Sequence, residues 1–416
     1  MQKHSLSSRL KFTAAVALIA ASSSAFAMDS TDILPRTVNS PQFRYGIMDG
    51  ADKKFDATGS LITQVDANSM NFGTNEIVAL DANARKFIEA LNQASPGLGN
   101  SLNLGTLKID ARPEVRYMAP VFARGITKKL TLAAAIPIIN YTNNVEVSQS
   151  GVNNAAQVRA QAGGSLGAEG EAAFQTLQAG VVAGLTDSLQ KGGYKPLVSR
   201  QESLVGDLQL HGLYKFYSNK RLSALSRTIV SLPTGKQDDP DDLMDLGTYG
   251  ELALEQGVVA NLSVTHQFTL AAKASYKFVA PLDSDVRVPK SSGDALPGMD
   301  RKETVLRDGG DTTTIGGSAT VSINDEISVG SGIDLSHKQK DQLYGSHSDW
   351  DYSILENRSE QTAAKVKAGI EYSTTTAYTK GRSAIPFKIA YEFANTFAGK
   401  NVLNTSVHEF ALSLFF

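Results

Sequence analysis

The chain has 416 residues, a formal net charge of −2 at pH 7 and no cysteine. Without cysteine it forms no disulfide and offers no thiolate for metal binding or catalysis. The near-neutral charge gives no strong field for attracting nucleic acid, so no nucleic-acid partner is expected. After the first residues, no apolar run reaches the roughly 20 positions that a transmembrane helix needs.

The first residues predict export. Lys3, Arg9 and Lys11 form a basic start. An apolar run follows over 12–21, and Ala25-Phe26-Ala27 supplies the small–x–small pattern that a signal peptidase cuts after. These are the parts of a secretory signal peptide, which we expect over 1–27.

The end of the chain carries the pattern that decides the fold class. Phe410, Leu412, Leu414 and Phe416 share one face, and the other face carries Glu409, Ala411, Ser413 and Phe415. Strict period two indicates a β-strand with one face in an apolar medium and one in a polar interior. A terminal aromatic residue on such a strand is typical of outer-membrane barrels, so Phe416 is expected to contact the barrel-assembly machinery.

The same alternation recurs upstream and predicts an all-β fold, a transmembrane antiparallel up-and-down β-barrel of about 12 strands, within a range of 10–14. The alternative is a large soluble β-sandwich. The expected strands cover 60–73, 105–123, 127–141, 204–217, 221–233, 251–264, 267–281, 312–323, 327–341, 361–376, 386–397 and 403–416.

The domain prediction follows from this strand list. The barrel is expected over 59–416, in the outer membrane of a Gram-negative bacterium, where it contacts lipid and lipopolysaccharide. Segment 28–58 alternates weakly and is expected to be a plug in the barrel or a periplasmic segment. Short polar turns predict the periplasmic side, and the long segments between them predict extracellular loops.

The clearest alternation lies in 105–123, where one face is apolar and the other is charged. Such charges cannot face lipid, so they are expected to line the lumen, as is His211 on a later strand. The predicted lumen-lining residues are Lys108, Asp110, Arg112, Glu114, Arg116 and His211.

Two of the long loops show helical spacing of apolar residues, over 75–93 and 168–190. Each apolar stripe needs a partner, so the two helices either pack together as a lid or also form a groove for an apolar solute. The residues predicted for that groove are Phe87, Leu91, Phe174, Leu177, Val181 and Leu185.

Motifs for catalysis, cofactors and metals are absent from the sequence. It contains no G-x-S-x-G and no metal-ligand spacing of histidines, so neither an enzyme nor a cofactor is expected. A lipid-modifying enzyme that uses His211 remains an alternative. The acidic run Asp238–Asp245 is either a hydrated loop or a site for a hard cation.

Three short motifs resemble a known family. Arg124-Gly125-Ile126-Thr127 precedes a strand that ends in Ile136-Pro137-Ile138. Gly206-Asp207-Leu208 opens another strand, and Leu232-Pro233-Thr234-Gly235 ends the next. Together they resemble the outer-membrane family named for the meta-pathway of phenol degradation, within the FadL-like superfamily. Pro137 and Pro233 are candidate strand bends, because proline cannot donate a ladder hydrogen bond.

The resemblance implies passive uptake of hydrophobic small molecules, either aromatic hydrocarbons or fatty acids. A general porin for hydrophilic solutes is one alternative, which the charged ladder of 105–123 favours. A structural or adhesive barrel that binds a partner through 141–203 is another.

Overall fold

The computed structural model describes residues 29–49, 52–63, 69–74, 77, 82–164, 166–178, 181–245, 250–291, 294, 296–357 and 359–416. Within these residues the chain forms a closed antiparallel barrel of 12 strands, as the alternation predicts. The predicted signal peptide lies outside the described residues.

Neighbouring strands of the barrel are hydrogen-bonded in a ring that starts and ends at β1. In ring order the strands are β1 (Asn39–Asp49), β21 (Ser406–Leu414), β19 (Phe387–Lys400), β18 (Gln361–Ser373), β16 (Ile327–Lys338), β15 (Thr312–Ser322), β12 (Phe268–Val279), β11 (Ala253–Ser263), β10 (Leu222–Leu232), β9 (Leu208–Ser218), β6 (Leu130–Ala135) and β5 (Asn103–Gly125).

The first barrel strand is β1, which corrects two predictions. The expected first strand over 60–73 is wrong, and the barrel starts at Asn39 rather than at 59. β1 closes the ring because it pairs with both β5 and β21. The backbone amide of Asn39 donates to the Phe416 carbonyl oxygen at 2.8 Å, which joins the two ends of the barrel sequence.

Each strand turns one face outward and the other into the bore. On β12, Leu270, Tyr276 and Phe278 are exposed on the outside, while Lys273 and Lys277 point inward. This is the order that a membrane demands, because lipid accepts apolar side chains and the interior can pair charges. The helices α9 (Ser353–Glu356) and α10 (Thr375–Thr379) are short, and in the described part of the chain no helix is long and apolar enough to cross a membrane.

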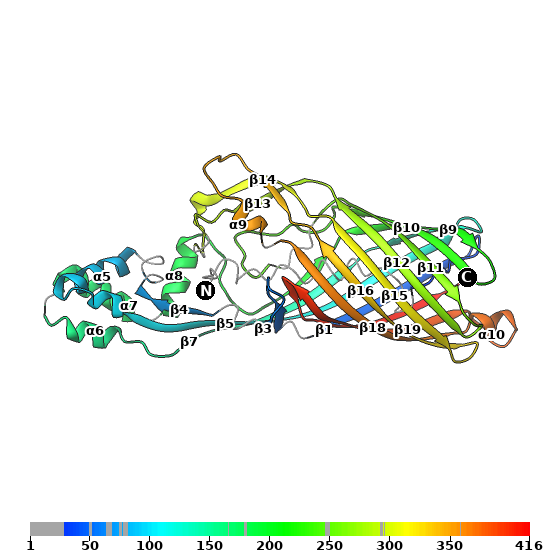
Figure 1. Cartoon of the computed structure of the whole chain (residues 1–416), viewed down its shortest axis with the longest axis horizontal. Helices are drawn as coiled ribbons and strands as arrows, with labels where there is room; N and C mark the ends of the chain where they lie inside the picture. Colours follow the sequence, from blue (N-terminus) through cyan, green and yellow to red (C-terminus); the bar gives the residue numbers. More distant parts are fainter. Residues whose placement is uncertain are drawn as a thin grey trace.

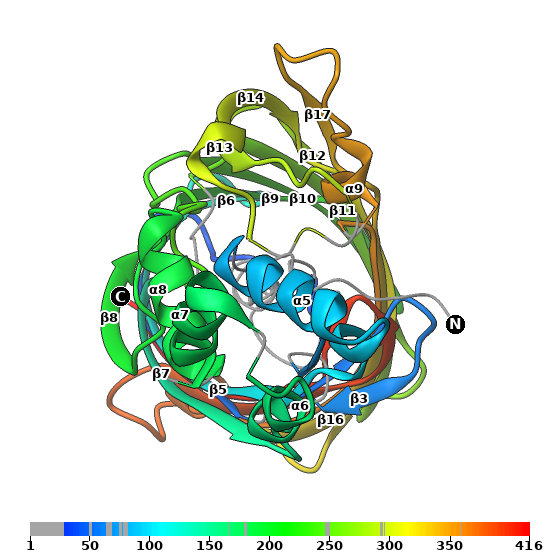
Figure 2. The same cartoon turned by 90° about the vertical axis from the view of Figure 1, so that its left-hand side faces the viewer.

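A cap rises from one end of the barrel (Figure 1). β5 continues past the other strands and pairs there with β7 (Ile138–Ser150), which pairs with β8 (Arg200–Val205). Between them the chain forms α5 (Ala82–Ala94), η1 (Leu98–Ser101), α6 (Ala155–Gln161), α7 (Gly167–Gln178) and α8 (Val181–Lys191). Figure 2 shows α5, α7 and α8 over the end of the barrel.

Short strands complete this end of the molecule. β4 (Met70–Gly73) adds to β5, and two three-stranded sheets stand apart from the barrel wall. One sheet contains β13 (Leu282–Arg287), β14 (Lys302–Asp308) and β17 (Gln342–Tyr344), with η2 (Met299–Arg301) leading into β14. The other contains β2 (Lys53–Phe55), β3 (Leu61–Thr63) and β20 (Val402–Leu403).

The two faces of β15 make the membrane assignment testable. Ile315 points outward near the middle of the barrel wall and Thr314 points inward. Ile315→Arg should lower the free energy of unfolding by ~2–4 kcal/mol, because the charge would face lipid near the midplane. Thr314→Arg should lower the free energy of unfolding by well under half of that amount. Urea-dependent folding into vesicles measures both variants, and equal losses would contradict the assignment.

Candidate functional site: a filled bore beside a split in the wall

The segment that precedes β1 runs through the bore. Its Leu34 amide donates to Thr131 Oγ1 on β6 at 2.9 Å, and Thr31 Oγ1 lies 2.5 Å from Ser223 Oγ on β10. At Gly125 of β5 an ideal Cβ would lie 1.9 Å from the Pro35 carbonyl oxygen, so only glycine allows this close approach. The part of the predicted segment 28–58 that runs through the bore is therefore 29–38, since β1 forms wall.

Asp29 anchors this segment among buried charges in mid-bore. Its carboxylate lies 3.0 Å from Lys273 Nζ on β12 and 3.6 Å from Lys367 Nζ on β18. Both lysines also pair with Asp334 on β16, at 3.0 and 2.9 Å. A buried charge is costly unless it is paired, so these four side chains hold one another and the segment in place.

Further inward-facing charges surround this cluster. Arg44 lies 3.7 Å from Glu409, which also accepts a hydrogen bond from Tyr117, and Arg227 pairs with Glu255 at 2.7 Å. Arg44 and Glu409 pair because β1 lies beside β21, and the sequence alone does not predict that pairing.

His211 points into the bore from β9, on the face that the alternation assigned to it. Its Nε2 atom is buried and has no hydrogen-bond partner among the described residues. Within the same residues, no group of three His, Asp, Glu or Cys side chains is arranged to hold a metal ion.

The charged ladder of β5 does not line the bore, which corrects a central prediction. Lys108, Arg112, Glu114 and Arg116 are exposed and Asp110 shares their face, while the opposite face packs beneath the cap. The strand has 23 residues and extends about 75 Å at ~3.3 Å per residue, far more than a bilayer requires. Its charged half therefore stands in water above the apolar outer residues Met118 and Phe122.

The structure also corrects the predicted loop groove at three of its residues, which are Phe87, Leu91 and Phe174. Phe87 and Leu91 of α5 are fully buried, and Phe174 of α7 packs against Phe87 with ring centroids 5.6 Å apart. These side chains form the core of the cap and offer no surface groove. The side chains of Leu177, Val181 and Leu185 lie in α7 and α8 but outside the described part.

The barrel wall splits above the middle of one side. Pro137 lies between β6 and β7, and opposite it Gly206-Asp207 separates β8 from β9. Residues 136–137 face residues 206–208, so the pairing shifts by one residue between the β6–β9 ladder and the β7–β8 ladder, as in a β-bulge. An ideal Cβ at position 206 would lie 2.7 Å from Pro137 Cγ, which explains the glycine.

The neighbouring strand stops at the same level. β10 pairs with β9 up to Leu232 and ends before Pro233, and the sheet terminates at β8. Asp207 closes the corner, because its carboxylate accepts the amides of Gly235 at 2.8 Å and Glu251 at 3.3 Å. Thr234 Oγ1 accepts the Leu208 amide at 2.9 Å. The Gly-Asp and Pro-Thr-Gly motifs thus meet where the wall divides.

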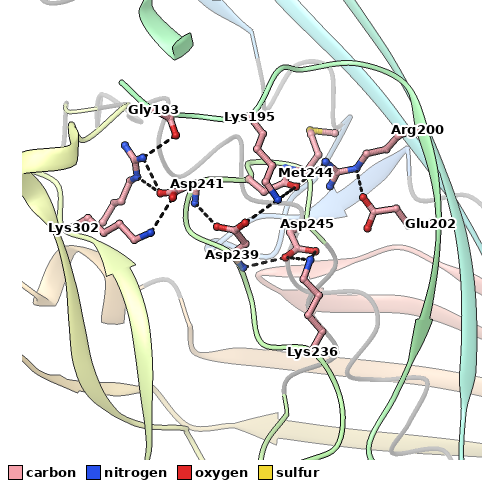
Figure 3. Close-up of polar contacts among 12 residues, drawn as sticks. Gly193, Lys195, Arg200, Glu202, Lys236, Asp239, Asp241, Met244, Asp245 and Lys302 are labelled. Atoms are coloured by element: carbon pink, nitrogen blue, oxygen red, sulfur yellow. Dashed lines mark hydrogen bonds and ion pairs between the residues drawn. The ribbon is translucent and has the colours of Figure 1, made fainter. Parts of the chain in front are cut away.

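The acidic segment 236–245 fills the split (Figure 3). Asp242 lies 2.7 Å from Arg200 of β8, and Asp239 lies 2.8 Å from Lys195 just before that strand. On the other side Asp241 pairs with Arg287 at 2.7 Å and with Lys302 at 2.8 Å. Asp245 pairs within the segment, with Lys236 at 3.2 Å. These carboxylates face protein cations, which favours a bridging loop over the predicted alternative of a cation site.

The electrostatics of the segment match this geometry. Burial alone would raise the pKa of Asp239, but the hydrogen bond from Lys195 holds that pKa below its usual value. Burial would also raise the pKa of Asp241, but the hydrogen bonds from Lys302 and Arg287 hold that pKa below its usual value. The pair of Lys195 and Asp239 is partly exposed, and such pairs contribute ~0.2–1 kcal/mol. Asp242 and Arg287 are buried, so loss of the partner of either one would leave a buried charge without compensation.

Comparisons with known proteins agree with this architecture. An outer-membrane channel from Pseudomonas putida F1 is similar in structure, with 10% identity, a TM-score of 0.50 and coverage of 94% of this chain and 99% of that one. The Ralstonia pickettii toluene transporter TbuX matches with 9% identity, a TM-score of 0.36 and coverage of 92% and 90%. A Pseudomonas aeruginosa FadL homologue has 10% identity, a TM-score of 0.32 and coverage of 100% and 98%.

The first of these similarities assigns the fold, which is that of an outer-membrane channel. At such identities nothing finer follows. No protein-family model and no curated protein sequence matches the chain.

The lowered pKa values of Asp239 and Asp241 predict acid release of the segment. A carboxylate with a depressed pKa stabilises the folded contact at pH above its ordinary value near 3.8, and this contribution is lost as the pH falls through the depressed value. Hydrogen exchange of 236–245, corrected for its intrinsic pH dependence, should be slow at pH 6 and fast below about pH 3.5. The double variant Asp239→Asn/Asp241→Asn should exchange fast at both, and slow exchange in this variant would contradict the assignment.

Proposed function

We propose that this protein is an outer-membrane channel for the passive uptake of hydrophobic small molecules, such as aromatic hydrocarbons or fatty acids, and that it is a FadL-like transporter of the phenol meta-pathway family. The predicted signal peptide, the channel fold and the meeting of the two family motifs at the split support this proposal. The outer leaflet of lipopolysaccharide obstructs apolar solutes, and a protein path removes that obstacle.

We infer that segment 29–38 blocks the bore, and the position of the split beside that bore carries the proposal. An apolar molecule in mid-bore would displace water and counter-charges from Lys273, Lys367 and Asp334 without replacing their interactions, which is unfavourable. At the split the wall is already interrupted, and outward apolar side chains such as Val205 and Leu210 lie beside it. The solute therefore enters above the level of segment 29–38 and leaves sideways at the foot of the split, where Val205 pairs with Ile138 beside Met118 of the apolar outer surface.

A general porin for hydrophilic solutes is the second candidate, because the paired charges of the bore would suit water and ions. It requires that 29–38 leave the bore. The two candidates differ in electrical conductance, since a lateral apolar path carries no ions.

Uptake by whole cells tests the proposed substrate class. Cells that produce the protein should accumulate radiolabelled toluene or lauric acid several times faster than cells that lack it. Uptake of a hydrophilic sugar of similar size should not change. A stimulated sugar uptake with unchanged toluene and lauric acid uptake would refute the proposal in favour of the porin.

Planar-bilayer recordings test the blocked bore. The intact protein should show little steady conductance, whereas deletion of 29–34 should open a large conductance because the segment and Asp29 leave mid-bore. Asp29→Asn should have a smaller effect in the same direction, since the paired lysines lose one counter-charge. A large open conductance of the intact protein would contradict both the blockage and the lateral path.

A further inference from the structure

The acidic segment that fills the split has an apolar centre. Leu243 and Met244 lie between its ion-paired aspartates and are 8% and 1% exposed. Met244 packs against Ala111 of β5, Val145 of β7 and Leu197, on the inner face of the cap's strands. Leu243 joins the main core of the cap. A small apolar cluster therefore lies directly beside the split, and the space that Met244 fills within it would be an apolar pocket if this side chain left.

The backbone on both sides of Met244 is held by polar contacts. Its amide donates to Asp242 Oδ1 at 3.0 Å, and its carbonyl oxygen accepts the Tyr141 hydroxyl at 3.2 Å. One backbone bond, from the Lys195 amide to the Asp241 carbonyl oxygen at 2.8 Å, joins the segment to the chain before β8. The ion pairs of Asp239, Asp241 and Asp242 and the hydrogen bond from Tyr141 add to this contact.

We propose that the pocket of Ala111, Val145 and Leu197 is a binding site for the apolar solute, and that Met244 occupies it as a built-in substitute until the solute displaces it. This inference rests on the proposed function and assigns its capture site. Methionine suits the role because its unbranched, polarisable side chain adapts to an irregular apolar space and leaves it without a large change of shape. The ligand class is an uncharged or long-chain hydrocarbon group, because the three pocket residues contribute only apolar side chains.

Displacement would couple binding to opening. When solute replaces Met244, apolar surface stays covered, so the exchange mainly loses the polar contacts of the rim. Segment 236–245 then moves away from Arg200 and Lys195, and the split beside Gly206 is uncovered. A ligand shifts such an equilibrium only by the difference between its affinities for the two states. Here the solute prefers the open state, in which Met244 has left the pocket.

The absence of native cysteine gives a direct test. In the variant Met244→Cys the thiol should react slowly with a water-soluble maleimide, and addition of toluene or lauric acid should raise the rate severalfold. Val152→Cys, at an exposed site, should react fast under both conditions. Val288→Cys, buried in the separate β13–β14 cluster, should stay slow under both conditions and so controls for general loosening by the solute.

A rate at position 244 that does not respond to toluene and lauric acid would overturn the inference, and so would an equal rise at position 288. Because labelling does not depend on transport, this failure is distinct from that of the proposed function. Unchanged labelling at position 244 together with stimulated uptake would refute the capture site and leave the proposed function standing.

Truncation of the occupant tests the same site in the opposite direction. Met244→Ala empties the pocket without adding a charge, so toluene should bind severalfold more tightly because its competitor is gone. Val305→Ala, a matched truncation of a buried side chain away from the pocket, should leave toluene binding unchanged. Weaker binding in Met244→Ala than in Val305→Ala would overturn the inference.

Discussion

The structure depends on one constraint, which is that a backbone inside lipid must satisfy all its hydrogen bonds within the protein. A closed ring of strands meets this constraint, and it forces one face of every strand toward lipid and the other toward the bore. The bore then collects the charges that lipid rejects, and these charges must pair with one another. Asp29 is held in mid-bore because Lys273 and Lys367 are there to receive it.

The same constraint determines where the wall can open. The ladder between β9 and β10 stops at Leu208 and Leu232, toward the end of the barrel that carries the cap, and beyond Gly206 strand β8 pairs, among the described strands, with β7 alone. At that level, contacts of side chains replace the backbone hydrogen bonds of the ladder. Asp207 receives the backbone amides at the corner, and the aspartates of 236–245 join the separated parts by ion pairs. Both the bore and the split contain paired charges, but Leu243 and Met244 give the split an apolar centre, which suits an apolar solute better.

Period-two alternation predicted most of the barrel because it records the two environments of each strand directly. It failed for β1, because the weak alternation of 28–58 predicts a plug or a periplasmic segment and not a wall strand. It also failed for the charged face of β5, because alternation separates two faces without stating which one is inside. Lys108 and Arg116 would face the bore in a strand of membrane length, but here they lie above the membrane.

The candidate site was predictable only in pieces. Gly206-Asp207 and Thr234-Gly235 were visible as motifs, yet their contact depends on β9 lying beside β10. The cations that meet the acidic run come from three places, before β8, in β8 and in β13–β14, so no local pattern announces them. Burial of Met244 likewise depends on the meeting of β5, β7 and the loop before β8.

The most direct measurement separates the sideways path from the bore. Thr31 Oγ1 and Ser223 Oγ are 2.5 Å apart, so the double variant Thr31→Cys/Ser223→Cys places two thiols where a disulfide fixes segment 29–38 inside the barrel. If solute leaves through the split, toluene uptake by the oxidised variant should equal that of the same protein after reduction. Loss of uptake on oxidation and its return on reduction would show that the solute passes through the bore.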